Sequence, residues 1–247
     1  MPTIQQKRNN LYLILCSIFI TNAIVAEIIG VKIFSAEQTL GIAPVQIPLI
    51  GGFKFDFNLT AGVVIWPFVF ITSDLINEYF GKEGVKRISY ITASLIAYSF
   101  IIIYTVTLLA PANFWLDVNK TDVAGNVFNI NSAFASIFRQ GMNIITGSII
   151  AFLISQLLDA AIFHHLKTIT GDKKIWLRAT GSTVISQFID SFVVLYIAFY
   201  VFGNWSFMQV INVGLGNYIY KFFIAILLTP VIYFAHKLID NYLKPVN

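Results

Sequence analysis

Ser155-Gln156-Leu157-Leu158-Asp159 and Ser186-Gln187-Phe188-Ile189-Asp190 repeat one polar pattern, 31 residues apart, inside two hydrophobic runs. Each run is long enough to cross a lipid bilayer, which takes roughly 20 apolar residues. A carboxylate inside a bilayer is costly unless it faces a cavity, has a partner or is protonated. The repeated pattern therefore predicts a polar site inside a membrane protein.

The composition of the whole chain supports this interpretation. Of its 247 residues, 57% are hydrophobic and 11% are charged, and the mean hydropathy is +0.76. Soluble domains carry about a quarter charged residues. We therefore expect an all-α integral membrane protein with a single domain over residues 1–247. The lone cysteine, Cys16, excludes an intramolecular disulfide and a cysteine metal cluster.

Six segments are predicted to span the membrane as helices. They are about Leu11–Phe34, Leu59–Tyr79, Ile88–Ala110, Gly141–His165, Ile175–Phe202 and Phe207–Lys237. Lysine and arginine concentrate before the first span, after the second, between the fourth and fifth, and after the last. Because cytoplasmic loops carry an excess of these residues, both termini are expected in the cytoplasm.

Two further local features are expected from the sequence around the second span. Trp66-Pro67 lies inside it and is expected to kink it, because proline removes a backbone donor. The external segment Ser35–Asn58 contains helix-breaking Gly and Pro and ends in the alternating stretch Phe53–Phe57. That pattern predicts a short hairpin over the outer face.

Asp74 and Glu78 are four residues apart on the second span and therefore share a helix face. They lie near its cytoplasmic end. One interpretation is a helix end entering water, with Glu78 paired to Lys82 one turn on. The other is that the two acids belong to a polar site within the membrane.

The fourth and fifth spans run in opposite directions, so their acids lie at different depths. Asp159 is roughly 9 Å from the inner end of its helix at 1.5 Å per residue, whereas Asp190 lies near the midplane. Neighbouring small residues are explained by helix packing, but the acids, Gln156 and Gln187 are not. We predict a polar path rather than a symmetric pair, with Gln156, Gln187 and Asp190 at its core.

Lys221 is the one basic residue deep in a predicted span, and Asn217 precedes it by one turn. Pairing with Asp190 would lower the cost of burying both charges. The pair could be a structural link between helices or a contact for a substrate. The roles of Glu27 and Lys32, toward the outer end of the first span, stay open.

The sequence favours no metal, cofactor or enzyme. His164-His165 lacks the spaced acidic partners typical of a metal site. There is no HExxH motif, glycine-rich phosphate loop or nucleophile elbow. An intramembrane enzyme that uses paired acids is therefore the least favoured hypothesis.

In order and spacing these motifs resemble the queuosine precursor transporter family, formerly described as vitamin uptake transporters. The first motif runs from Pro67 through Asp74 and Glu78 to Gly81, and the Ser-Gln-x-x-Asp pair follows. The resemblance extends from about Leu11 to Lys237. It implies import of a 7-deazaguanine such as preQ0, preQ1 or queuine across the inner membrane, and a fold similar to the substrate-binding subunits of energy-coupling-factor vitamin transporters.

Substrate contacts are then expected among seven residues: Asp74, Glu78, Gln156, Asp159, Gln187, Asp190 and Lys221. A carboxylate can accept from the N–H groups of a guanine-like edge, and an amide can donate to its carbonyl. The partners expected are the heterocyclic base and the lipid bilayer, with no nucleic acid. The protein could act alone or as a homodimer, coupled to protons through its buried acids, or as a binding subunit that needs energising partners.

Overall fold

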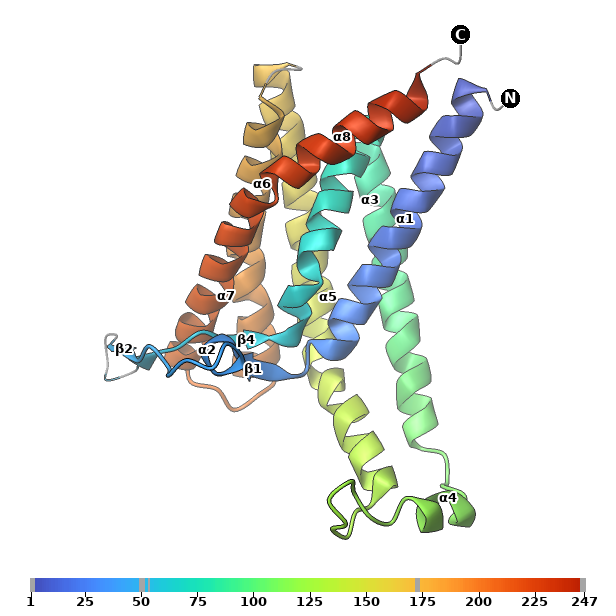
Figure 1. Ribbon diagram of the computed structural model, residues 1–247, viewed down its shortest axis with the longest axis vertical. Helices are drawn as coiled ribbons and strands as arrows, with labels where there is room; N and C mark the ends of the chain where they lie inside the picture. The colour runs from blue at the N-terminus through green and yellow to red at the C-terminus, as the bar shows by residue number, and fades with distance from the viewer. Residues whose placement is uncertain (1–2, 49–51, 53, 172–173, 245–247) are drawn as a thin grey trace.

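The computed structural model describes residues 3–48, 52, 54–171 and 174–244, with the backbone alone at 140–144 (Figure 1). The long helices are α1 (Ile4–Ile29), α3 (Trp66–Thr107), α5 (Ile130–Thr170), α6 (Ile175–Leu195) and α7 (Phe207–Leu227). Shorter ones are α2 (Ala36–Thr39), α4 (Asn113–Val118) and α8 (Thr229–Leu243). All five long helices are apolar enough to cross a membrane, α6 together with a π-helical turn over Tyr196–Val201.

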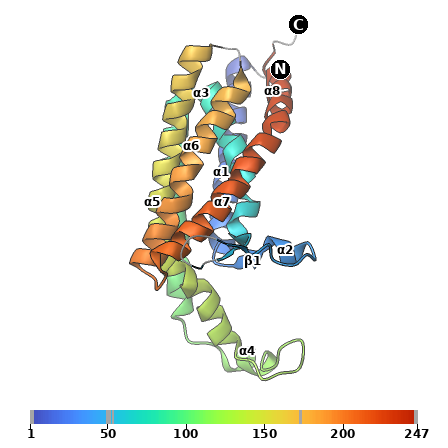
Figure 2. The same ribbon diagram turned by 90° about the vertical axis from the view of Figure 1, so that its left-hand side faces the viewer.

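The helices form a bundle that has both termini at one end (Figure 1). That end is called the termini end below, and the opposite end, where the short strands lie, the strand end. Figure 2 shows α6 between α5 and α7, and α5 in turn packs on α3. Fully buried apolar side chains fill the space between the helices, among them Phe19, Ile76, Ile88, Ile96 and Phe152. The prediction of a mostly helical membrane protein is confirmed.

The helix α3 reverses its direction within one continuous run of 42 residues. Gly81 interrupts it with φ 72° and ψ −179°, a conformation that is essentially restricted to glycine. Figure 1 shows the part over 66–80 approaching the termini end and the part over 82–107 returning from it. The second and third predicted spans are therefore joined by a single residue rather than by a loop.

Gly81→Ala is expected to destabilise the protein by about 1–3 kcal/mol, because an alanine there must hold a strained backbone. The open space around the position means that the backbone, and not a clash, causes the loss. Gly181→Ala is the control, since Gly181 lies inside α6 and an added Cβ would meet only the flexible ends of Leu166 at 3.3 Å and Leu177 at 4.0 Å. The midpoint of thermal unfolding in detergent should fall for the first variant and stay or rise for the second.

Two prolines begin helices where the sequence suggested that the helix continues. Pro67 lies in the first turn of α3, so it starts this helix, and the expected kink at Trp66-Pro67 is wrong. Pro230 lies in the first turn of α8, so the predicted span Phe207–Lys237 divides after Leu227. Proline suits the first turn because its fixed φ is already helical and its missing N–H has no partner there. In Figure 1, α8 runs obliquely across the termini end.

The segment between α1 and α3 forms two small antiparallel ladders. Strand β1 (Ile33–Ser35) pairs with β4 (Asn58–Thr60), and β2 (Ile47–Pro48) pairs with β3 (Lys54–Phe55). The predicted hairpin is thus present as two short pairs, although Phe53 lies outside the described residues. Phe55 packs against Gly216 of α7, where a Cβ would lie 3.3 Å from its ring. The strands therefore close against the strand end of α7.

Glu37 stabilises this strand segment through hydrogen bonds. Its buried carboxylate accepts hydrogen bonds from the N–H of Phe57 at 2.7 Å and from the hydroxyl of Ser35 at 3.0 Å. Burial alone would raise the pKa of Glu37, but these hydrogen bonds outweigh it and the pKa lies below its ordinary value. The carboxylate therefore stays ionised at neutral pH and keeps the segment in place.

Candidate functional site

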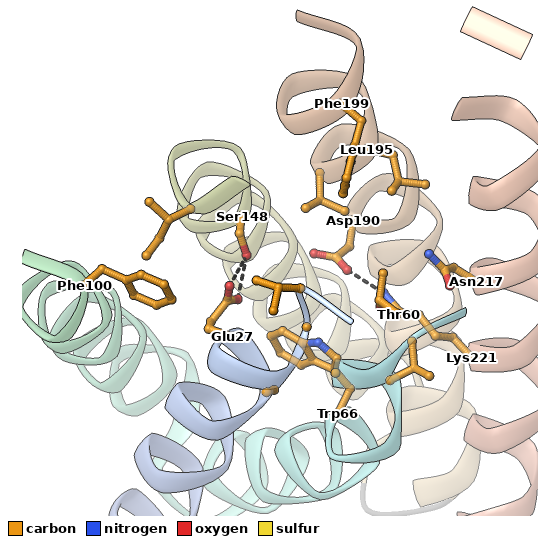
Figure 3. A pocket seen from close by; sticks show the side chains of 17 residues that line it. Glu27, Thr60, Trp66, Phe100, Ser148, Asp190, Leu195, Phe199, Asn217 and Lys221 are labelled. Atoms are coloured by element: carbon orange, nitrogen blue, oxygen red, sulfur yellow. Dashed lines mark hydrogen bonds and ion pairs between the residues drawn. The ribbon is translucent and has the colours of Figure 1, made fainter. Parts of the chain in front are cut away.

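A cavity of about 70 Å³ lies inside the bundle near the strand end. Four helices contribute polar side chains to its lining, with Glu27 on α1, Ser148 on α5, Asp190 on α6, and Asn217 and Lys221 on α7. The indole of Trp66, at the start of α3, lies between Glu27 and Lys221 in Figure 3. The 3₁₀ turn at Ala61–Val64 and the end of β4 complete the wall on the strand side.

The strongest polar contact in the cavity is an ion pair. The Lys221 ammonium donates to an Asp190 carboxylate oxygen at 2.6 Å, and both residues are more than 90% buried. The predicted pairing is confirmed. One turn before Lys221, the buried Asn217 also lines the cavity, and its side-chain oxygen has no hydrogen-bond partner in the described structure. On α7 the cavity is thus lined by the Lys221 ammonium, which is paired, and by the Asn217 oxygen, which lacks a donor.

On the opposite side, Glu27 meets Ser148. The serine hydroxyl lies 2.6 Å from each carboxylate oxygen of Glu27. The sequence left Glu27 open and did not single out Ser148, because a serine among many small residues on α5 gives no signal of its own. Lys32 is exposed and is not part of the cavity lining.

A second group of polar side chains lies between this cavity and the termini end, and it is called the middle layer here. Its members are Ser73, Asp74, Gln156, Asp159, Thr183, Ser186 and Gln187, all of them buried. Asp159 accepts from Ser186 at 3.2 Å and from Thr183 at 3.5 Å, which joins α5 to α6. Ser73 donates to Gln156 at 2.9 Å, which joins α3 to α5.

Two oxygens of the middle layer have no hydrogen-bond partner in the described part of the chain, Oδ1 of Asp74 and Oε1 of Gln187. A void of about 10 Å³ borders Asp74 and Thr183, which is about the space that one water needs. Buried polar atoms are nearly always satisfied in native proteins. The middle layer is therefore suited to take up a further donor.

A third group closes the termini end. Arg178, which is 1% exposed, donates to both carboxylate oxygens of Glu78 at 2.8 and 3.0 Å, and Lys167 lies 3.0 Å from the same carboxylate. The suggested pairing of Glu78 with Lys82 is wrong. A bidentate guanidinium contact across two helices is stronger than an exposed contact between neighbouring turns.

The structure thus divides the seven expected site residues by depth. Asp190 and Lys221 line the cavity; Asp74, Gln156, Asp159 and Gln187 belong to the middle layer; and Glu78 belongs to the termini-end group. Along α6 the three levels follow one another at Asp190, Ser186 and Arg178. Polar groups from the three levels therefore form a series along the bundle. Among the described residues, no group of three His, Cys, Asp or Glu side chains could hold a metal ion.

Comparison with known proteins gives matches over most of the chain. Residues 60–235 match the family model described as "Putative vitamin uptake transporter". A "Probable queuosine precursor transporter" of Bacillus subtilis is 27% identical over 188 residues, which cover 76% of each chain. The "Queuosine precursor transporter" of Escherichia coli is 26% identical over 184 residues, 74% of this chain and 73% of that one. No solved structure matches.

Proposed function

The chain belongs to the family described as "Putative vitamin uptake transporter", and on that premise we propose that it carries a queuosine precursor across the inner membrane. The precursor would be a 7-deazaguanine base such as preQ0, preQ1 or queuine. The names of the relatives support this substrate class. The five long apolar helices support a multi-pass membrane protein.

We further propose six crossings with both termini in the cytoplasm. The two antiparallel parts of α3 on either side of Gly81 support counting this helix twice (Figure 1). The excess of lysine and arginine near the termini end supports the orientation. The cavity then lies toward the outer side of the membrane, and the group around Glu78 and Arg178 closes the cytoplasmic exit.

The observation that carries the proposal is the cavity with its Asp190–Lys221 pair and the unpartnered Asn217 oxygen. Buried groups of this kind orient a ligand that offers both donors and acceptors. At about 70 Å³ the cavity is smaller than the few hundred Å³ typical of ligand sites, so a base enters only when the surrounding helices part. Asp74, Gln156, Asp159 and Gln187 would receive the base, or a coupled proton, on its way to the inner end.

The test is uptake of a labelled 7-deazaguanine into liposomes that contain only this purified protein. Accumulation that increases with an imposed pH gradient is expected, and Asp159→Ala should abolish it while the variant still assembles in detergent. Binding without uptake would instead identify a substrate-binding subunit that needs energising partners. Normal uptake by Asp159→Ala would show that the middle layer does not take part in transport.

A further inference from the structure

The cavity lining contains one more acidic side chain than basic side chains. Glu27 and Asp190 supply carboxylates, and Lys221 is the one basic side chain in the lining. Lys221 is engaged by Asp190 at 2.6 Å. Glu27 forms no ion pair within the described residues, and the hydrogen-bond partner of its carboxylate there is the neutral hydroxyl of Ser148. A charge in this position is costly in a membrane unless something compensates it.

Glu27 also retains unused capacity to accept hydrogen bonds. A hydroxyl has a single hydrogen, so Ser148 can donate to only one of the two carboxylate oxygens at a time, although it lies 2.6 Å from both. An ionised carboxylate has about four acceptor sites. Figure 3 shows Glu27 on the α1 side of the cavity, facing Asp190 and Asn217 across it.

The Asn217 oxygen is an independent sign of a missing donor. Asn217 is 4% exposed, lines the same cavity and leaves this acceptor without a partner in the described structure. A buried unpartnered oxygen costs its full desolvation penalty until a donor arrives. Glu27, with its spare acceptor sites, and the unpartnered Asn217 oxygen belong to opposite walls, so a single ligand rich in N–H groups can meet both.

We propose that Glu27 is a specificity-determining residue, which selects a base bearing a positively charged amine over an uncharged base of the same ring. The inference rests on the proposed function and refines it. Among 7-deazaguanines, an aminomethyl arm supplies the cation, whereas a nitrile at the same ring position is neutral. The ammonium would lie against Glu27, and the N–H edge of the ring would reach Asn217, with Trp66 as the flat apolar surface beside the ring.

The experiment compares the affinities of 7-aminomethyl- and 7-cyano-7-deazaguanine, measured by calorimetry on the detergent-purified protein. The native chain should bind the aminomethyl compound at least about tenfold more tightly, since a hydrogen bond to a charged group contributes enough for that ratio. In Glu27→Gln the ratio should fall below about threefold, mainly through weaker binding of the aminomethyl compound. Glu83→Gln is the control: its exposed carboxylate lies outside the cavity, so its ratio should stay native.

Each other outcome has a defined meaning. Equal affinities in the native chain, or an unchanged ratio in Glu27→Gln, overturn the inference and leave the proposed function standing. If Glu27→Gln binds both compounds with native affinity but no longer transports them, Glu27 carries a proton during transport, and this result also overturns the inference. Failure of the native chain to bind either compound removes the proposed function itself. If Glu27→Gln does not fold, Glu27→Asp, which keeps the charge, should retain a preference for the aminomethyl compound, and its loss would overturn the inference.

Discussion

Asp190→Ala is expected to abolish uptake and to lower the midpoint of thermal unfolding by about 10 °C. In the native chain the Lys221 ammonium lies 2.6 Å from the Asp190 carboxylate, and the variant leaves this buried ammonium without its ion pair. Breaking a buried pair in this way costs about 3–5 kcal/mol. The measurement is thermal unfolding in detergent together with uptake in liposomes. An unchanged midpoint would contradict a buried charged pair.

The double variant Asp190→Leu/Lys221→Met separates the two roles that this pair could have. Replacing both partners by apolar groups of similar size is neutral or stabilising, so the folding midpoint should return to the native value. If the pair contacts substrate, binding and uptake stay lost in the refolded double variant, and we expect this result. Recovery of uptake together with stability would make the pair a purely structural link between α6 and α7.

Glu78→Ala is expected to destabilise the protein by a comparable amount, about 3–5 kcal/mol. Arg178 is 1% exposed and loses both hydrogen bonds of its bidentate contact, while Lys167 loses the same counter-charge. The midpoint of thermal unfolding should fall by about 10 °C. A smaller loss is expected for Arg178→Lys, which keeps the charge but cannot form the planar fork.

Glu83→Ala is the matched control on the same helical hairpin. Glu83 forms an ion pair with Lys86 at 3.0 Å, but its side chain is 82% exposed. Exposed pairs contribute about 1 kcal/mol or less, so the midpoint should scarcely move. Equal losses for Glu78→Ala and Glu83→Ala would show that burial of the Arg178 contact does not determine its contribution.

The features that could be predicted from the sequence are those with a local or unique signal. Long apolar runs predicted the long helices. Lys221 is the one basic residue deep in a predicted span, so its pairing with Asp190 followed by elimination. Glu78 shows where local rules fail. A lysine four residues away suggested a pair, but the true partner Arg178 is 100 residues distant and is brought close only by helix packing.

The cavity itself had no sequence signal. Its helical lining comes from two or three residues on each of five helices, and residues such as Ser148 and Trp66 are common packing types. Their role depends on which face of each helix turns inward, and periodicity does not determine this for helices that are apolar on every side. The prolines did carry a signal, since Pro67 and Pro230 each begin a helix and Pro230 divides the predicted sixth span.

The single-residue reversal at Gly81 also determines where a reporter group can be attached. The apex has no loop to lengthen, so an inserted tag would separate the two parts of α3. The segment between α4 and α5 offers the contrast, with Val123 and Val127 fully exposed around a turn at Gly125. Exposed loop tips tolerate insertions best. A fluorophore or an antibody epitope placed at Ala124-Gly125 would therefore report on the protein from outside the bundle without touching the polar series within it.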